Sequence, residues 1–148
     1  ETRLADPDAR ALLAEYLAFR AATFPGPGLY RPASPDPAVF APPEGAFLVA
    51  AVDGALAGCG GVRGLSPERH EVKHLWVRPE FRGTGVGRAI LADLEHRAAS
   101  AGATELVLDT HDSLTEAGAL YRSRGFREIP AYNDNPNATL WFAKTLVP

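Results

Sequence analysis

The sequence predicts a single domain of the mixed α/β (α+β) class that spans residues 1–148. The length, with 46% hydrophobic and 22% charged residues, is that of one domain with its own apolar core. Apolar runs on both sides of Asp53-Gly54 predict a β-hairpin. Further along, an apolar run is followed by alternating glycines and then by apolar residues at helical spacing, which predicts a strand, a loop and a helix.

The composition excludes several classes of function. A net charge of -3 leaves no broad basic surface for nucleic acid. No apolar run approaches the roughly 18 residues that a membrane span needs. Cys59 is the single cysteine and the four histidines show no metal-ligand spacing, so we expect a cytoplasmic protein without a metal site. The chain has no methionine, and we expect its start to have been trimmed or processed.

The first helix is expected near the N-terminus. Asp6 and Pro7 have the form of an N-cap and a first helical residue, and apolar residues recur at helical spacing to about residue 22. The next segment, residues 25–43, is too rich in proline for a long helix or a central strand. It is either a plain surface connection or a binding loop that uses Tyr30, Arg31 and Phe40. Its prolines are Pro25, Pro27, Pro32, Pro35, Pro37, Pro42 and Pro43.

The remaining elements are predicted by strand and helix periodicity. A helix begins near Val86 and ends at Gly102. A second helix begins at a capping box formed by Ser113 and Glu116 and ends at Gly125. Strands are expected over residues 46–52, 55–62, 71–77, 105–110, 126–129 and 139–146.

The loop before the first of these two helices is suited to an anion. Gly83, Gly85 and Gly87 let backbone amides approach a ligand closely, and the helix N-terminus adds unpaired N–H donors. Arg82 and Arg88 supply positive charge for a pyrophosphate. The dinucleotide motif GxGxxG is excluded because arginine stands where its last glycine is needed, and the P-loop motif is absent. We therefore expect a phosphorylated cofactor.

The order of these motifs resembles that of the GNAT acyltransferase superfamily. The resemblance rests on R-x-x-G-x-G at residues 82–87, after the strand that leads into LWVRPEFRG, and on ELVLDT and ALYRSRGF further along. It covers roughly residues 46–146. It implies a mostly antiparallel, twisted sheet of six or seven strands with helices on both faces.

The resemblance also implies which residues bind acetyl-coenzyme A. The glycine loop would hold the pyrophosphate, and the strand before it would offer backbone groups to the pantetheine arm and the thioester. An asparagine that bonds the pantetheine in many family members is replaced here by Leu114, so Thr110 or Ser113 would have to substitute for it. The cofactor-binding residues implied are Leu75, Trp76, Val77, Arg82, Gly83, Thr84, Gly85, Val86, Gly87 and Arg88.

Acetyl transfer to an amine calls for an acid and a base. Tyr121 occupies the tyrosine of LYRSRGF, and the resemblance implies that it protonates the leaving thiolate. Glu71 and Asp109 are rival candidates for the base, and water alone or a histidine remains a further alternative. His74, on the same strand as Glu71, is expected to be exposed, and Cys59 is expected to pack without acting as a nucleophile.

The acceptor is expected to lie against the loops. Tyr30, Tyr132 and Asn133 are candidate substrate-binding residues, and Asp134 adds a negative charge suited to a cationic amine. The predicted function is N-acetylation of a small-molecule primary amine by direct attack on acetyl-coenzyme A in a ternary complex. The alternatives are acetylation of a protein or peptide, or a non-catalytic acyl-coenzyme A sensor. Monomer and homodimer both remain open.

Overall fold

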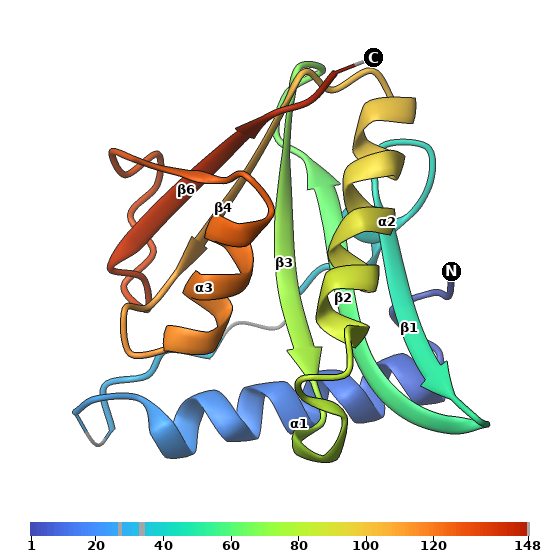
Figure 1. Ribbon diagram of the computed structural model, residues 1–148, viewed down its shortest axis with the longest axis vertical. Helices are drawn as coiled ribbons and strands as arrows, with labels where there is room; N and C mark the ends of the chain where they lie inside the picture. The colour runs from blue at the N-terminus through green and yellow to red at the C-terminus, as the bar shows by residue number, and fades with distance from the viewer. Residues whose placement is uncertain (27, 33–34, 148) are drawn as a thin grey trace.

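Six strands form one mixed sheet in a computed structural model that describes residues 1–26, 28–32 and 35–147 (Figure 1). Pro27, one of the prolines named above, lies outside the described residues. The strands are β1 (Ala46–Val52), β2 (Ala55–Gly64), β3 (Arg69–Val77), β4 (Glu105–Thr110), β5 (Arg127–Ile129) and β6 (Leu140–Thr145). The helices are α1 (Pro7–Thr23), α2 (Val86–Ser100) and α3 (Thr115–Ser123), with short 3-10 turns η1 (Pro37–Phe40) and η2 (Pro79–Phe81).

The sheet order is β1-β2-β3-β4-β6-β5, and β3 with β4 is the parallel pair in an otherwise antiparallel sheet. α2 connects β3 to β4, as a parallel crossover requires. β6 returns between β4 and β5, so the last strand is covered on both edges. The predicted mixed class, the strand number and the mostly antiparallel pairing are confirmed.

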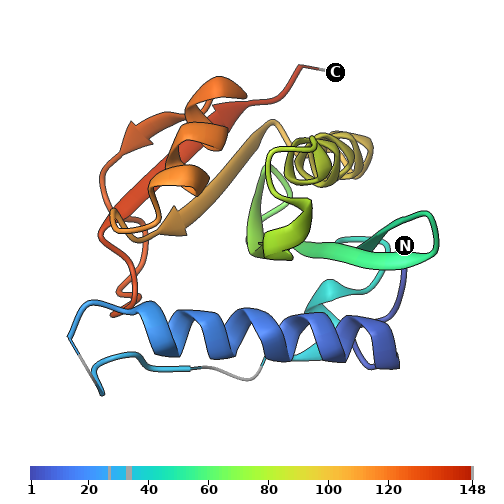
Figure 2. The same cartoon turned by 60° about the horizontal axis from the view of Figure 1, so that its bottom comes forward.

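Helices cover both faces of the sheet, as predicted (Figure 2). One apolar cluster joins α2 and α3 to the sheet, and a second joins α1 to the opposite face. Alternation along β1 supplies both clusters, because Phe47 faces α1 while Ala46 and Leu48 face α2. Within the described ranges, every helix is too short or too polar to cross a membrane.

The turn and helix-stop signals are confirmed at their glycines. Asp53 and Gly54 have φ of 50° and 82°, as a two-residue hairpin with both central residues left-handed requires. Gly102 and Gly125 end α2 and α3 with φ of 97° and 89°.

The predicted capping box at Ser113 is wrong. α3 begins one residue later than a Ser113 N-cap requires, at Thr115, and its N-cap is Leu114, which offers no side-chain hydrogen bond. The amide of Ser113 instead donates to Nδ1 of His111 at 3.1 Å, so residues 111–113 form a separate turn after β4. This leaves the Ser113 hydroxyl free of the capping role.

β3 carries a bulge that the sequence did not predict. Cys59 of β2 pairs with Trp76, whereas Gly61 pairs with Lys73, so β3 holds one extra residue between these pairs. His74 lies in this bulge with a φ of 59°. The bulge reverses the alternation, so that Trp76 packs against α1 and Leu75 faces the α2 side.

The proline-rich segment is more than a surface connection. It contains η1, and Phe40 at the end of η1 is buried with its ring 6.1 Å from that of Phe47. Gly61 of β2 makes room for this ring, because a Cβ there would lie 2.8 Å from two Phe40 carbons. The segment is therefore anchored in the core beside α1.

Candidate active site

The site lies where β3 and β4 separate. The two strands pair only over Arg69–Glu71 and Glu105–Val107, and their later residues diverge. Beyond these residues, the backbone N–H and C=O groups that β3 and β4 turn toward each other form no strand-to-strand hydrogen bonds between them. They are therefore available to a ligand. Two cavities occupy this region, each within the size range of small-molecule sites.

The first, which we call the cofactor cavity, has a volume of about 590 Å³. It extends from the divergence of the strands to the loop before α2. Nine of the ten predicted cofactor residues line it: Leu75, Trp76, Val77, Arg82, Gly83, Gly85, Val86, Gly87 and Arg88. The tenth, Thr84, does not line the cavity, and its hydroxyl donates to the carbonyl of Phe81.

The glycine loop has the backbone that an anion site needs. Gly83 and Gly85 adopt φ of 76° and 90°, and Gly85 is the N-cap of α2. The first amides of α2 therefore point out of the helix end beside the cavity. Arg82 donates from Nε to the carbonyl of Val77 at 3.2 Å, and its guanidinium lies 5.1 Å from the ring centre of Trp76. This contact fixes a positive charge at the cavity wall.

The second cavity, which we call the acceptor cavity, has a volume of about 650 Å³. Its walls come from α1, the proline-rich segment, the diverging strands and the loop before β6. The two cavities share six lining residues: Tyr16, Arg20, Leu75, Leu114, Ala117 and Tyr121. A ligand in one cavity can therefore reach a ligand in the other.

Tyr121 stands at this junction. Its ring packs 5.9 Å from those of Phe126 and Phe142, which fixes the side chain on α3. Among the described residues, its hydroxyl forms no hydrogen bond. Burial raises the pKa of this phenol, with smaller contributions from Tyr16 and Asp109. The hydroxyl is therefore protonated at neutral pH and able to donate.

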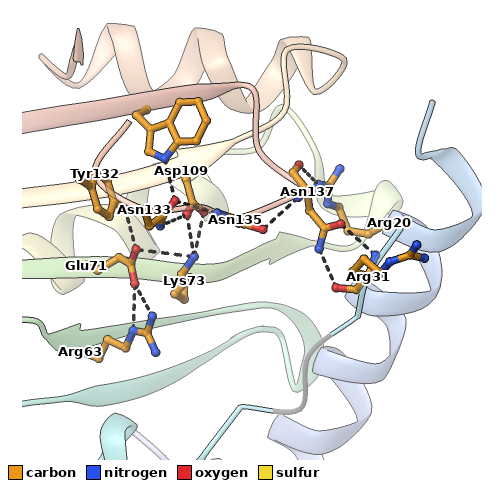
Figure 3. Close-up of polar contacts among 11 residues, drawn as sticks. Arg20, Arg31, Arg63, Glu71, Lys73, Asp109, Tyr132, Asn133, Asn135 and Asn137 are labelled. Atoms are coloured by element: carbon orange, nitrogen blue, oxygen red, sulfur yellow. Dashed lines mark hydrogen bonds and ion pairs between the residues drawn. The ribbon is translucent and has the colours of Figure 1, made fainter. Parts of the chain in front are cut away.

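Asp109, at the end of β4, lines the acceptor cavity. Lys73 Nζ lies 2.8 Å from Oδ1 and 3.0 Å from Oδ2, and the Asn133 amide donates to Oδ2 at 2.7 Å (Figure 3). Burial opposes ionisation of this carboxyl, but the Lys73 charge and the hydrogen bonds outweigh it and lower its pKa. Asp109 is therefore a carboxylate at neutral pH.

Glu71 lies deeper than Asp109 and lines neither cavity. It is 1% exposed, and Arg63 lies 2.8 Å from Oε1. Its Oε2 accepts a hydrogen bond of 2.6 Å from Tyr132, and Lys73 Nζ is 3.6 Å away (Figure 3). Tyr132 likewise lines neither cavity, and its pKa is raised by burial and by Glu71. The structure thus brings Tyr121 and Asp109 to the acceptor cavity but not Glu71 or Tyr132.

Some of the remaining predicted residues line the acceptor cavity and others lie outside it. Tyr30 and Asn133 line the acceptor cavity, whereas Asp134 is exposed outside it. His74 is not exposed as expected, because it is half-buried in the cavity wall, and burial lowers its pKa to about 4. Cys59 is buried, which raises its pKa to about 12 and agrees with a packing role.

Leu114 stands at the position where the resemblance implies an asparagine in many family members. Leu114 lines both cavities, and Ser113 lines the cofactor cavity. Thr110 lines the acceptor cavity. Of the two substitutes considered for the asparagine, Ser113 therefore lies on the cofactor side.

Sequence reasoning missed Arg20, Lys73 and Tyr16 as cavity residues. A signal for Arg20 was present, because it falls at helical spacing on the apolar stripe of α1 that includes Leu12 and Leu13. A charged residue on a buried stripe needs a partner or a ligand. Lys73 gave no such signal, since an exposed lysine on a strand is ordinary.

Comparison with known proteins identifies the family. The model of the acetyltransferase (GNAT) family matches residues 11–126, and the chain belongs to this family. An uncharacterized N-acetyltransferase of Schizosaccharomyces pombe is 37% identical over 99 residues, which are 66% of this chain and 61% of that protein. The chain thus spans about three fifths of the length of this curated relative.

Solved structures agree on the fold. A GNAT-family acetyltransferase from Staphylococcus aureus Mu50 superposes with a TM-score of 0.81 at 18% identity, covering 96% of each chain. A GNAT-family acetyltransferase from Elizabethkingia anophelis, solved with acetyl-CoA bound, superposes with a TM-score of 0.60 at 23% identity. That match covers 70% of this chain and 77% of the other.

Proposed function

We propose that this protein transfers the acetyl group of acetyl-coenzyme A to a primary amine of a small molecule, by direct attack in a ternary complex. The observation that carries the proposal is the meeting of two cavities at Tyr121, whose phenol is protonated and has no described hydrogen-bond partner. Direct transfer needs both substrates within reach of one proton donor. Membership in the acetyltransferase (GNAT) family supports the same reaction.

The cofactor cavity fits acetyl-coenzyme A. A left-handed Gly85 at the start of α2, with Arg82 and Arg88 in the wall, suits the pyrophosphate. The separated strands leave backbone groups for an extended arm. A neighbour of this fold, from Elizabethkingia anophelis, is solved with acetyl-CoA bound.

In the proposed reaction, the amine nitrogen bonds to the thioester carbonyl carbon, the carbon–sulfur bond breaks, and the sulfur leaves with a proton from the Tyr121 hydroxyl. The proton that the nitrogen loses as the amide forms then returns through water to Tyr121. An amine of pKa about 10.4 must first lose a proton, at a cost of about 4–5 kcal/mol at pH 7. Of the two predicted bases, Asp109 is the one that lines the acceptor cavity, and it can receive this proton through water. Glu71 is the less favoured base because it is buried and lines neither cavity.

The shape of the acceptor cavity favours a small molecule over a protein substrate. The proline-rich segment contributes Tyr30, Arg31, Pro32 and Pro35 to its wall, so the cavity is covered on the side of α1. A peptide chain would need an open groove there.

Calorimetric titration with acetyl-coenzyme A, with coenzyme A and ATP as comparison ligands, tests the proposal. Saturable binding of both coenzyme A species without a response to ATP is the expected result, followed by amine-dependent release of free thiol. No binding by folded protein would refute the proposal. Binding without turnover on a broad amine panel would favour a sensor of acyl-coenzyme A instead.

A further inference from the structure

One end of the acceptor cavity has unbalanced positive charge. Arg20 of α1 and Arg31 of the proline-rich segment both line this end. Among the described residues, no carboxylate oxygen lies within 4.0 Å of either guanidinium. The residues outside the description have no acidic side chains; they are Pro27, Ala33, Ser34 and Pro148.

Arg20 is the more unusual of the two, because it is only 4% exposed. Its Nη2 donates to the carbonyl of Asn137 at 3.2 Å, whereas its Nη1 is buried with no hydrogen-bond partner in the part of the chain that the structure describes. The guanidinium lies 5.5 Å from the ring centre of Phe24 and 5.4 Å from that of Tyr30. These rings offset part of the cost of burying the charge, and the hydroxyls of Tyr16 and Tyr30 interact with the guanidinium, but both groups are neutral and leave its charge uncompensated.

Two other cations that line the cavity are already paired with carboxylates. Lys73 is paired with Asp109 at 2.8 Å, and Arg63 is paired with Glu71 at 2.8 Å. Burial keeps His74 neutral at physiological pH. The remaining charge of the buried wall is therefore that of Arg20.

Asn137 holds the backbone of the proline-rich segment in position at Arg31. The Asn137 side chain accepts from the amide of Arg31 at 2.9 Å and donates to its carbonyl at 2.7 Å (Figure 3). Asp36 also lines the cavity, but its carboxylate is used to cap η1, accepting from the Ala38 amide at 2.9 Å. The cationic end is thus fixed by the fold before any ligand arrives.

We propose that the acceptor is a primary amine that also carries a carboxylate, and that Arg20 binds this carboxylate while the amine faces Tyr121 and Asp109. The inference rests on the proposed acetyltransferase function and names its substrate class. A guanidinium with a free Nη1 matches a carboxylate oxygen, and Arg20 and Tyr121 line the same junction. An amino acid is the simplest molecule of this class. A plain cationic amine would instead be repelled from the Arg20 end.

The test compares each common amino acid that has a primary amine with its primary amide as acceptor, in the intact protein and in Arg20→Met. We expect the intact protein to prefer the acid of at least one pair, and Arg20→Met to lower kcat/KM for that acid by about 10- to 100-fold. For the matching amide we expect a change of less than about threefold. Acid and amide differ in amine basicity, but this difference cancels when the acid-to-amide ratios of the two proteins are compared.

Arg10→Met is the matched control, because Arg10 is an exposed arginine on the same helix and lines neither cavity. It should leave the acid-to-amide ratio unchanged. Equal losses for acid and amide in Arg20→Met would overturn the inference, as would acetylation confined to amines without a carboxylate or failure of every amino acid while acetyl-coenzyme A still binds. Loss of acetyl-coenzyme A binding by the intact protein would instead refute the proposed function itself.

Discussion

Replacing Tyr121 by phenylalanine removes the hydroxyl and keeps the ring, so it tests the catalytic role of the hydroxyl apart from the packing of the ring. We expect Tyr121→Phe to lower kcat by about 10²- to 10⁴-fold, the range of general acid catalysis, while acetyl-coenzyme A affinity changes less than about threefold. The ring contacts with Phe126 and Phe142 are retained, so stability should hardly change. Steady-state kinetics and calorimetry measure these quantities. Unchanged turnover would remove Tyr121 from the acid role.

Tyr16→Phe is the comparison for that variant. Tyr16 also lines both cavities, and burial raises its pKa to about 12. Because Tyr16 lies on α1 rather than α3, we expect Tyr16→Phe to lower kcat by less than about tenfold. A larger loss in Tyr16→Phe than in Tyr121→Phe would assign the proton transfer to Tyr16.

His74 gives a prediction for stability against pH. Burial first, and then the charges of Lys73 and Arg63, lower its pKa to about 4. An unfolded histidine has a pKa near 6.5, so between about pH 4 and 6.5 the unfolded state binds more protons. The stability that neutral His74 provides is therefore present above pH 6.5 and lost as the pH falls to 4. We expect this loss to reach up to about 3 kcal/mol.

Urea denaturation of His74→Asn at pH 7, 5.5 and 4 measures this contribution. Asparagine tolerates the left-handed φ of 59°, so the bulge should persist. The fall in the free energy of unfolding should be shallower in this variant than in the intact protein, whereas His96→Asn, on the exposed face of α2, should reproduce the original slope. Identical slopes in all three proteins would contradict the assignment.

At the level of whole elements, the glycines at the two ends of α2 have a similar φ, but only Gly85 is proposed to bind the cofactor. Gly85 and Gly102 have φ of 90° and 97°, and a Cβ added to either meets nothing within 4 Å. We expect Gly85→Ala and Gly102→Ala to lower stability by a similar amount, about 1–2 kcal/mol each, because both put alanine in the left-handed region. Only Gly85→Ala should weaken acetyl-coenzyme A binding. Equal affinities in calorimetry would contradict the placement of the pyrophosphate.

The elements themselves were largely readable from local signals. The Asp53-Gly54 turn, the α2 stripe and the stop at Gly102 depend on neighbours in sequence, and each was predicted correctly. The extra residue at His74 could not be predicted, because a bulge is defined by the register between β2 and β3. Ser113 was assigned to a cap by a local pattern that the contact with His111 overrides.

The same limit applies to the site. The residues predicted to bind the cofactor come from two short neighbouring stretches, 75–77 and 82–88, so a local motif is enough to predict them, and nine of the ten line one cavity. The acceptor cavity is assembled from α1, β3, β4 and the loop before β6, which no single stretch of sequence brings together. The contacts that hold Glu71 away from that cavity likewise depend on strand register and on a distant loop, because Arg63 lies opposite Glu71 on β2 and Tyr132 is 61 residues away.

At the scale of the whole molecule, a buried ion pair connects β3 and β4 just beyond the residues where the backbones of these two strands stop pairing. Lys73 of β3 and Asp109 of β4 lie 2.8 Å apart, with side chains 18% and 5% exposed. Removing one member leaves the other charge buried and unpaired. We expect Lys73→Met to lower the free energy of unfolding by about 3–5 kcal/mol.

The double variant Lys73→Met with Asp109→Asn should recover more than half of that loss, because a neutral amide remains where a charge would be stranded and Asn133 still lies beside it. As a control, Arg122→Met breaks an ion pair of similar length with Glu128, whose partners are 53% and 56% exposed, and should cost less than about 1 kcal/mol. Urea denaturation of the four proteins gives the comparison. If the double variant were no more stable than Lys73→Met, the stabilisation would come from lysine packing rather than from charge. The relative position of the diverging halves of β3 and β4 would then depend on the two apolar clusters and not on this ion pair.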